Sequence, residues 1–503
     1  MILTNKCARE RILAGTRKLC NVVGLTLGPK GRNVIIERNG TPLITNDGVT
    51  IARHVKLDDQ FENIGAQVLL QSSTQTNKNA GDGTTSAIVL GAALMEHGMR
   101  AIEFGANPVQ LKDGLLHAAK IATDFVEKNS RDVADDNLTA IAIASCQNQA
   151  DGELVARAFQ TVGADGTITL TESYNSTGTT MTISNGCEID ATLVNPLFAT
   201  DPAKLESIFH DAKIFITDKI VSSLQNILPL MEISVRDKTP LVIIAPDYSQ
   251  EVTQALLVNK LRAGLTVAPL KWMNTSFATA SAQDIAAVCN TEIDQETNSA
   301  TATVSKIICG MQNSVIIGSG PNEKLDARLE LIRAQITIGN DEYSRDRLQK
   351  RLAKLTGSIA TIHIGCSTEI ETKEKKLRIE DAICAVRAAS KGGITEGGGM
   401  TYIRAKNALE QHAFEPNHMD GARVLINSLD AVTRQIATNA GANADLIISR
   451  IHELGYNAAT DTYENMWHAN IIDPTLVITS VIQNATSATA TLLTTDAVIG
   501  LLV

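Results

Sequence analysis

Helical spacing of hydrophobic positions dominates both ends of the chain. From Gln60 to Ala80, small or apolar side chains fall on one helix face, at Phe61, Ile64, Gly65, Val68 and Ser72. The same period resumes from Thr84 to Phe104. Upstream, a first helix is predicted to end at Gly28-Pro29, because glycine and proline terminate helices. Helical texture covers residues 8–128 and returns over residues 392–490.

The middle of the chain has a different texture. Short β-rich runs at residues 167–171, 214–217, 241–245 and 304–308 alternate with helices, which is typical of an α/β segment. Residues 323–355 are strongly charged, with leucines at helical spacing, and predict two helices that break near Gly339-Asn340. Because 503 residues exceed the roughly 250–300 residues of one ordinary core, we expect several domains of α and α/β class.

A Gly-Asp-Gly-Thr-Thr loop at residues 81–85 joins two of the predicted helices. Its glycines let backbone approach an anion, and the hydroxyls of Thr84, Thr85 and Ser86 stand at a helix N-terminus, where phosphate binds well. Asp82 can hold a hard cation such as Mg²⁺. The chain contains no Gly-x-x-x-x-Gly-Lys-[Ser/Thr], so this phosphate site is of an unusual kind. The alternative explanation of the loop alone is a helix-helix turn with Asp82 as a cap.

Six other motifs accompany the loop. They are NVVGLTLGPKGR at 21–32, TNDGVTIA at 45–52, IEDA at 379–382, GGG at 397–399, GYNAAT at 455–460 and IIDPT at 471–475. In order and spacing they resemble the group I chaperonins, the GroEL type, from about Ala8 to about Thr495. Each motif alone is weak, but all six in sequence are highly specific.

The resemblance implies the chaperonin fold, with three nested domains. The mainly helical equatorial domain, which binds ATP and makes the ring contacts, would comprise residues 1–128 and 392–503. A small α+β intermediate domain would comprise residues 129–185 and 360–391, and an α/β apical domain residues 186–359. The return of helical texture near residue 392 agrees with this nesting.

An ATP site is also implied by the resemblance. Small residues leave room for a flat base, and glycines permit close approach of the phosphates. The matching positions are Thr26, Leu27, Gly28, Pro29, Asn46, Asp82, Gly83, Thr84, Thr85, Ser86, Gly398, Asn457, Ala458, Ala459 and Asp473. For Asn457-Ala458-Ala459 taken alone, the alternative is the start of a helix.

The resemblance implies a separate role for each of three carboxylates. Asp82 would bind Mg²⁺, Asp47 would help to orient the attacking water, and Asp381 would act as general base. Taken alone, Asp381 is more often interpreted as a solvated helix residue beside Glu380. K⁺ is implied near the phosphates, with Thr26, Asn46 and Thr85 as its ligands. Family members commonly have Lys at position 46 and use its backbone carbonyl, so Asn46 is compatible with the site.

The apical domain of the family exposes an apolar patch for non-native proteins and for a co-chaperonin lid. The aligned positions are Leu193, Leu197, Phe198, Leu228, Met231, Leu257 and Val258. Taken in isolation, each of these residues is more often part of an ordinary hydrophobic core than of a binding surface. Residues 494–503 resemble a strand that pairs with a neighbouring subunit, which predicts a homo-oligomeric ring.

Several departures mark a divergent member, of the sort that a phage or a duplicated bacterial copy encodes. Gly186 is kept at one hinge, but Ser358 stands where the other hinge glycine is expected. Ala191 replaces an arginine that pairs with the counterpart of Glu369 in a neighbouring subunit. The Gly/Met-rich tail is missing, and the sequence stops at Val503.

Composition argues against nucleic-acid-binding, disulfide-bonded and membrane-spanning classes of protein. The net charge of -10 argues against a nucleic-acid surface. Eight cysteines without C-x-x-C or zinc spacing predict reduced thiols. The N-terminal residues contain no apolar run long enough for a signal peptide, and we expect no stretch of about 18–20 apolar residues that would span a membrane. The cytoplasm is the expected compartment, or the host cytoplasm if a phage encodes the protein.

The leading functional prediction is therefore an ATP-driven protein-folding ring that captures unfolded chains and releases them into a cavity after ATP binding. A structural or holding ring that keeps the fold but cycles little ATP is the alternative. Intact Asp47, Asp82 and Asp381 favour the first, whereas Ala191 and Ser358 leave the second open. A small-molecule kinase lacks any recognisable second-substrate site.

Overall fold

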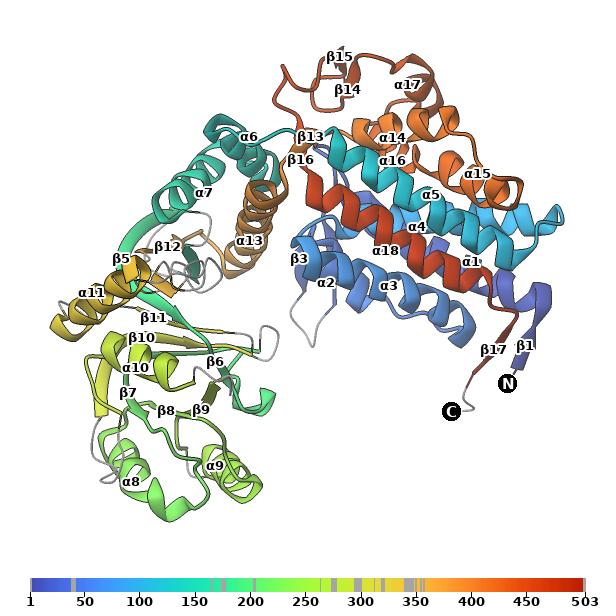
Figure 1. Cartoon of the computed structure of the whole chain (residues 1–503). Helices are drawn as coiled ribbons and strands as arrows, with labels where there is room; N and C mark the ends of the chain where they lie inside the picture. The colour runs from blue at the N-terminus through green and yellow to red at the C-terminus, as the bar shows by residue number, and fades with distance from the viewer. Residues whose placement is uncertain are drawn as a thin grey trace. The chain divides into compact units, whose positions relative to one another are not determined.

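The described chain forms two compact units. The computed structural model describes residues 2–37, 42–163, 166–172, 178–201, 205–262, 264–272, 278–293, 301–311, 313–317, 322–338, 348, 351–352, 355 and 358–500. The first unit comprises Met1–Gln160, Glu172–Thr180 and His363–Val503, and the second comprises Thr161–Thr171 and Met181–Ile362 (Figure 1). The first unit therefore joins the two ends of the chain, as the return of helical texture predicted. The finer three-domain division stays a prediction.

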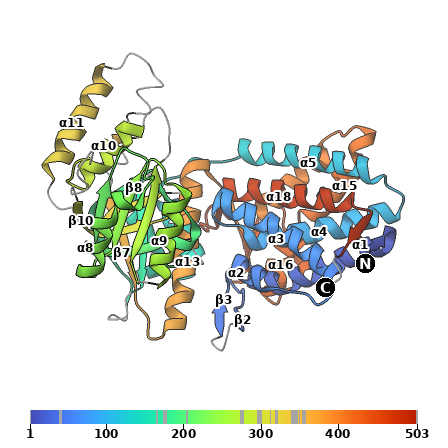
Figure 2. The same cartoon turned by 90° about the horizontal axis from the view of Figure 1, so that it is seen from below.

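A bundle of long helices forms the body of the first unit. They are α1 (Asn5–Val23), α2 (Gly48–His54), α3 (Gln60–Ala80), α4 (Thr84–Glu103), α5 (Pro108–Lys128), α14 (Met400–Gln411), α15 (Met419–Ser428), α16 (Ala431–Asn439), α17 (Ala444–Arg450) and α18 (Thr475–Leu493). Helix α18 packs against α3, α4 and α5, and lies between α5 and α3 in both views (Figure 1, Figure 2). One large hydrophobic core joins these helices except α2, which packs in a second core with residues of α1, α3 and α4.

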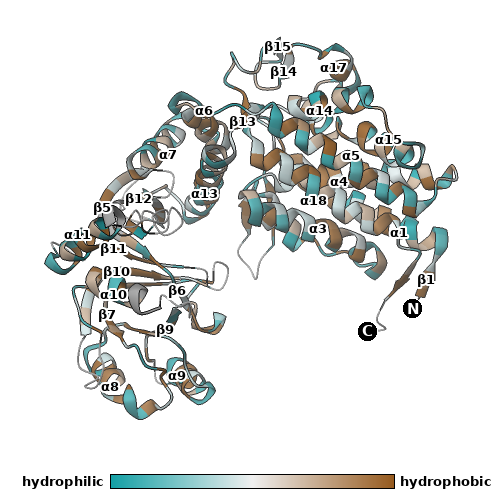
Figure 3. Ribbon diagram, viewed as in Figure 1, coloured by the Kyte–Doolittle hydropathy of each residue, from teal (hydrophilic) through white to brown (hydrophobic). Residues whose placement is uncertain are grey.

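Helix α18 is apolar along much of its length (Figure 3). Among the described residues it is the one helix long and apolar enough to cross a membrane, with 67% of its most apolar window buried. The expectation that no stretch reaches that length was therefore wrong. The explanation is its position, because a helix surrounded by others must be apolar on most of its faces. It is a core helix of the first unit.

Close packing of α1 on α3 depends on two glycines. A Cβ built on Gly15 would lie 1.8 Å from the Glu62 carbonyl oxygen, and one on Gly65 would lie 2.4 Å from that of Ile12. The Glu62 side chain is buried and accepts from Arg11 Nη1 at 3.2 Å and from Lys18 Nζ. The glycines permit the backbone approach, and the ion pairs compensate the buried carboxylate.

The first helix ends earlier than predicted. Helix α1 stops at Val23, a 3₁₀ turn follows at residues 24–26, and only then comes Gly28-Pro29. Asn439 explains the change, because its Nδ2 donates to the carbonyl oxygens of Gly24 and Leu27, each at 2.8 Å. A distant side chain thus satisfies carbonyls that a longer helix would have satisfied itself.

Three further helices belong to the first unit, namely α6 (Asp135–Cys146), α7 (Gln149–Val162) and α13 (Glu369–Gly392). Helix α6 packs against α13. Short antiparallel pairs complete the unit: β2 (Val34–Ile36) with β3 (Leu43–Thr45), β13 (Ile394–Glu396) with β16 (Ile472–Pro474), and β14 (Gly455–Asn457) with β15 (Thr462–Glu464).

The C-terminal strand has a partner within the chain. β17 (Ala497–Ile499) pairs antiparallel with β1 (Ile2–Thr4), with Leu3 opposite Val498. The fold brings the two ends of the chain together and lets each strand pair with the other on one edge. The pairing of residues 494–503 with a neighbouring subunit stays a prediction, because a strand has two edges.

Nine strands of the described chain form the sheet of the second unit. They are β4 (Thr167–Glu172), β5 (Thr180–Ile189), β6 (Ala191–Leu193), β7 (Ser207–Ile216), β8 (Leu241–Ala245), β9 (Val267–Trp272), β10 (Thr301–Cys309), β11 (Ser314–Ile317) and β12 (Ser358–Ile364). The order is β4-β12-β5-β11-β10-β7-β8-β9-β6. β7, β8 and β9 are parallel, whereas β10 is antiparallel to β7 and β11. The predicted α/β texture is confirmed.

Four helices accompany this sheet in the described residues: α8 (Leu228–Asp237), α9 (Gln250–Arg262), α10 (Ala278–Val288) and α11 (Glu323–Ile338). α11 is the first half of the predicted helical hairpin, and most of the second half lies outside the described residues. The buried carboxylate of Asp284 on α10 accepts from Arg328 Nε on α11 at 2.8 Å and from Arg351 Nη2 at 2.6 Å. All eight cysteines are free.

Candidate functional site

A cavity of about 650 Å³ lies within the first unit. Its volume is in the range of small-molecule and cofactor sites, which is about 300–1,000 Å³. Every residue predicted to bind ATP lines it, together with Asp47 and Asp381. The fold therefore brings together segments near residues 26–29, 46–48, 82–86, 381, 398, 457–459 and 473, which are far apart in the sequence.

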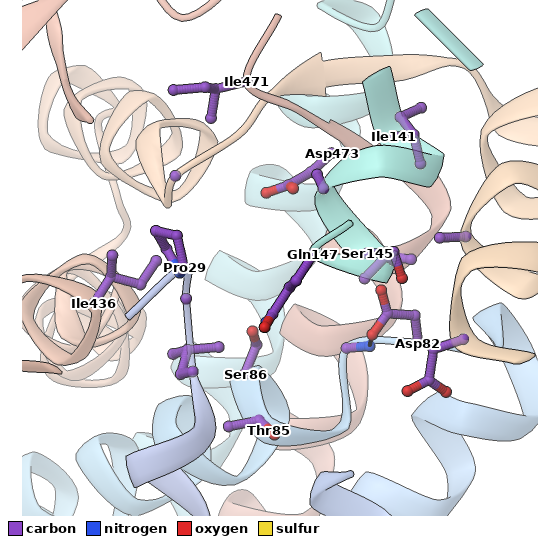
Figure 4. Close-up of a pocket in the computed structure, with 18 of the residues that line it drawn as sticks. Pro29, Asp82, Thr85, Ser86, Ile141, Ser145, Gln147, Ile436, Ile471 and Asp473 are labelled. Carbon is purple, nitrogen blue, oxygen red and sulfur yellow. Dashed lines mark hydrogen bonds between the residues drawn. The ribbon is translucent and has the colours of Figure 1, made fainter. Parts of the chain in front are cut away.

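The GDGTT loop forms one wall of the cavity. Helix α3 ends at Gly81, whose φ of 72° is left-handed, and α4 starts from Gly83, with φ of 87° and no side-chain cap. The first N–H groups of α4 are thus left for another acceptor, with Thr85 and Ser86 beside them (Figure 4). An anion is the natural partner at this position.

Asp82 does not cap α4. Its Oδ1 accepts from the N–H of Gly83 at 2.5 Å, which is a contact within the loop, and Gly83 occupies the cap position. The explanation of the loop as a simple turn capped by Asp82 is therefore wrong. The carboxylate lines the cavity.

A second uncapped helix N-terminus faces the same cavity. Helix α14 starts from Gly399, with φ of 82° and again no side-chain cap. The preceding Gly398 has φ of 64°, and a Cβ there would meet nothing closer than 3.7 Å. Its positive φ, and not lack of space within the protein, thus accounts for glycine. Two helix N-termini with glycine caps make a positively polarised wall that suits phosphate groups.

Three hydroxyl and amide groups fit the predicted K⁺ site. Thr26 Oγ1 lies 3.4 Å from Thr85 Oγ1 and donates to the carbonyl of Val23 at 2.9 Å. Asn46 lines the cavity beside them. Gly48 lets the segments approach, because a Cβ there would lie 2.3 Å from Thr85 Oγ1. Oxygen donors of this kind are the ligands that hard cations prefer.

Asp47 has a structural task that the sequence did not indicate. It is the N-cap of α2: Oδ1 accepts from the N–H of Val49 at 3.1 Å, and Oδ2 accepts from the N–H and the hydroxyl of Thr50 at 2.9 and 2.5 Å. These bonds hold the carboxylate still at the cavity wall.

The other three carboxylates of the cavity have raised pKa values. Desolvation raises the pKa of Asp381 well above its usual range, and the carboxylates of Asp47 and Asp82 raise it further. Desolvation also raises the pKa of Asp82, against the effect of the Gly83 N–H. Burial, and then the charge of Asp82, raise the pKa of Asp473 to about 7. Such shifts are typical of functional sites.

This electrostatic arrangement calls for a cation. Among the described residues, no Lys, Arg or His forms an ion pair with Asp82, Asp381 or Asp473. Nor do three or more His, Cys, Asp or Glu side chains of the described chain group into a complete metal site. Mg²⁺ is commonly held by one or two carboxylates, with phosphate oxygens and waters as its other ligands. Asp82, beside the α4 N-terminus, fits a metal bound in that way.

The side of the cavity that was predicted to bind the base and the ribose combines strand β14 with apolar residues. Asn457 is held in place: its Nδ2 donates to Glu464 Oε1 at 2.6 Å, and its Oδ1 accepts from the N–H of Ala459 at 3.0 Å. No helix starts at these positions, so the alternative explanation of Asn457-Ala458-Ala459 was wrong. Ile436 and Ile471 point into the cavity from opposite segments (Figure 4).

Comparison with known proteins agrees with this geometry. The family model described as the TCP-1/cpn60 chaperonin family matches residues 19–501. The chain belongs to the TCP-1/cpn60 chaperonin family. A relative named Chaperonin GroEL, from Methanospirillum hungatei JF-1, is 38% identical over 516 residues that cover 99% of this chain and 96% of the relative. The predicted resemblance to GroEL-type chaperonins is therefore confirmed.

Solved structures show the same fold over the full length of this chaperonin. The chaperonin gp146 from the bacteriophage EL 2 (Pseudomonas aeruginosa), crystallised in the presence of ATP-BeFx, matches with TM-scores of 0.72 and 0.67 in two crystal forms. In both, the sequences are 21% identical and 99% of each chain is covered. The predicted chaperonin fold is confirmed.

Sequence reasoning missed part of the cavity of this chaperonin. The C-terminal end of α6 and the residues after it contribute Ile141, Ser145 and Gln147, and Gln147 extends into the cavity (Figure 4). Gln147 has a positive φ of 53°, a conformation uncommon outside glycine and asparagine. No motif marks this segment. Tyr402 and Arg378 were also missed, although each lies near a recognised motif.

The predicted client-binding residues of the chaperonin divide into three groups. Leu197, Leu228 and Val258 are exposed, at 63%, 46% and 47%. Leu257 is partly buried against the core of the second unit. Leu193, Phe198 and Met231 are buried in that core and offer no exposed surface. The expected patch therefore differs from the structure at three positions, because these side chains fill the space between strands and helices.

Leu197 and α9 are held next to each other. Lys260 Nζ on α9 donates to the carbonyl oxygens of Leu197, Phe198 and Ala199 at 3.2, 2.6 and 3.4 Å. Leu261, the following residue of α9, is 74% exposed. Hydrophobic residues stand among hydrophilic ones on α8 and α9 (Figure 3). Leu261 thus adds to the exposed apolar surface formed by Leu197, Leu228 and Val258.

Proposed function

We propose that this protein is an ATP-dependent chaperonin, which binds non-native proteins on an apolar surface and promotes their folding through ATP binding and hydrolysis. The observation that carries the proposal is the cavity of the first unit. Two helix N-termini without side-chain caps surround it, together with three carboxylates that form no ion pair with a basic residue of the described chain. Polarised N–H groups suit phosphates, and carboxylates suit the metal that accompanies them.

In this proposal each part of the cavity has one task. The N-termini of α4 and α14 hold the phosphates, Asp82 holds Mg²⁺, and Thr26, Asn46 and Thr85 hold K⁺. Mg²⁺ would supply charge neutralisation at the phosphates. The segment 457–459 and Asp473 receive the base and the ribose. Asp381 on α13 accepts the proton of the attacking water, and Asp47, fixed as a helix cap, orients that water.

The remaining assignments come from family membership. We propose a homo-oligomeric ring with nested equatorial, intermediate and apical domains, which works in the cytoplasm and has neither nucleic-acid nor membrane partners. Leu197, Leu228 and Val258, which are exposed, support contact with unfolded proteins and with a co-chaperonin lid. Light scattering with ATP at micromolar protein checks the ring, since monomers alone would contradict it.

ATP turnover measured with and without a denatured protein tests the main proposal. We expect basal turnover that changes when denatured protein is added. A Leu228→Ser/Val258→Ser variant should capture less denatured protein, because buried apolar contact contributes about 25 cal/mol per Å². Its basal turnover should stay near wild type. Leu446→Ser is the matched control, because Leu446 is equally exposed, at 45%, but lies on α17 of the first unit.

The holding ring remains the competing function. Burial of Leu193, Phe198 and Met231 favours it, because this leaves less exposed surface for productive capture and release. A protein that prevents aggregation of a denatured client without measurable ATP turnover would establish the holding ring and contradict our proposal.

A further inference from the structure

Tyr402 is the least explained polar residue of the cavity. It lies on α14, three residues after the helix cap Gly399, and is only 1% exposed. It nevertheless lines the cavity, and its hydroxyl has no hydrogen-bond partner among the residues that the structure describes. A buried hydroxyl without a partner destabilises a protein by about 1–3 kcal/mol. An unpaired group of this kind therefore points to an acceptor or donor that occupies the cavity.

Two carboxylates of the cavity act electrostatically on the hydroxyl. Burial raises the pKa of Tyr402 well above its usual value, and the charges of Asp473 and then Asp82 act in the same direction. Both carboxylates thus lie within electrostatic range of the phenol, although neither accepts a hydrogen bond from it. Asp473 and Asp82 are on the ribose side and the metal side of the proposed nucleotide site. The part of a nucleotide between ribose and metal-bound phosphates is the α-phosphate.

We propose that the Tyr402 hydroxyl donates a hydrogen bond to the α-phosphate of the bound nucleotide. The inference rests on the proposed ATP site and adds one residue to it. Tyr402 acts there as a binding residue, and the α14 N-terminus with Gly398 and Gly399 supplies the neighbouring N–H groups. A hydrogen bond to a charged acceptor contributes more than one to a neutral acceptor, which favours phosphate over ribose as the partner.

A competing explanation is a bound water that satisfies Tyr402 whether or not a nucleotide is present. The two explanations differ in ligand dependence. A water would stabilise the free protein and leave nucleotide affinity unchanged. A phosphate contact would appear only with ligands that carry an α-phosphate.

The two explanations are distinguished by calorimetric binding of ADP, AMP and adenosine to the full-length Tyr402→Phe variant, with EDTA present. Phenylalanine removes only the oxygen atom. We expect ADP and AMP to bind about 10- to 100-fold more weakly than to wild type, and adenosine to bind equally well. Tyr456→Phe is the matched control, because Tyr456 also lines the cavity but its hydroxyl donates to Asp461 Oδ1 at 2.8 Å. It should not change the difference between AMP and adenosine.

Thermal unfolding gives a second readout. Without ligand, Tyr402→Phe should unfold at the same temperature as wild type or higher, because the unpaired oxygen is gone. With ADP, its stabilisation should be smaller than that of wild type. Unchanged ADP and AMP affinities, or an equal loss for adenosine, would overturn the inference alone. Failure of wild type to bind any of the three ligands, with Mg²⁺ as well as with EDTA, would overturn both the inference and the proposed ATP site.

Discussion

Carboxylates of the two units of this chaperonin differ in whether they pair with basic residues. In the second unit, buried Asp284 accepts from two arginines, Arg328 and Arg351. In the first, Asp82, Asp381 and Asp473 stand around one cavity without an ion pair to a basic residue of the described chain. The pKa of each of these three is raised, mainly by desolvation.

The contrast separates a structural charge from a functional one. A buried ion pair offsets its own desolvation within the protein, so Asp284 needs nothing from solution. The cavity carboxylates are compensated only when something cationic enters. A protein keeps such a destabilising arrangement where the charges act on a ligand. The comparison predicts that the two kinds of carboxylate respond differently to substitution.

Asp381→Asn should give the largest effect. The amide keeps the shape of the side chain but cannot accept a proton, so ATP hydrolysis should slow by about 10²- to 10⁴-fold, or roughly 3–5 kcal/mol in the barrier. Equilibrium binding of Mg²⁺ATP should persist, because Asp381 is not the proposed metal ligand. Single-turnover hydrolysis beside equilibrium binding measures both quantities.

Glu380→Gln is the control for this experiment. Glu380 is the neighbour of Asp381 on α13 but does not line the cavity. It should hydrolyse ATP near the wild-type rate. If Asp381→Asn also hydrolysed at that rate, Asp381 would lose its role, and Asp47 would be the better candidate for positioning water.

Local patterns predicted the GDGTT loop and the two helices that flank it well. The predicted helix from Gln60 to Ala80 has those bounds in the structure, and the GDGTT loop follows it. Both depend on spacing and on glycine within a short window. The family resemblance then supplied the distant partners, such as Asp381 and Asp473, that no local pattern could have joined.

Tertiary contacts determine the structural features that the sequence could not predict. Asn439 ends α1 early through contacts with residues more than 400 positions away. Gln147 reaches the cavity because of the fold, and no local motif marks it. Phe198 and Met231 match the aligned client surface but are buried, because hydrophobicity alone does not distinguish a core residue from a binding residue.

Asp284→Ala should destabilise the second unit by about 3 kcal/mol, because it leaves two guanidinium groups without their buried acceptor. We place the effect at the lower end of the range since Arg328 and Arg351 side chains keep 18% and 22% exposure. Chemical denaturation followed by Trp272 fluorescence, in a Trp467→Phe background, reports on this unit, whose core contains Trp272. Nucleotide affinity should not change. A loss of stability equal to that of an exposed control, Asp218→Ala, would show that the pairing contributes little.

Asp82→Asn should act in the opposite sense on stability. Removing a desolvated, unpaired charge should leave the ligand-free protein equally or more stable. Mg²⁺-dependent ATP affinity should fall by about 10- to 100-fold, since one charge-assisted contact contributes about 1.5–3 kcal/mol. Titration of ATP with and without Mg²⁺ measures this. If Mg²⁺ strengthened ATP binding to the variant as much as to wild type, the metal would have to be held elsewhere.

The pH dependence of Asp473 gives the smallest and most specific effect. Its pKa is raised from 3.8 to about 7 in the fold, so the folded protein holds this proton more tightly than the unfolded chain does. The resulting stabilisation is full below about pH 4 and is lost as pH rises to about 7. Asp473→Asn should therefore be more stable than wild type at pH 7.5 by about 1 kcal/mol. This is well below the free energy that the whole pKa shift would give, because water enters the cavity and because the new amide also needs hydrogen-bond partners. The advantage should vanish near pH 4. Thermal unfolding of ligand-free wild type and variant across this range measures the difference, and an advantage that stayed constant with pH would show that Asp473 is ionised in the folded protein throughout.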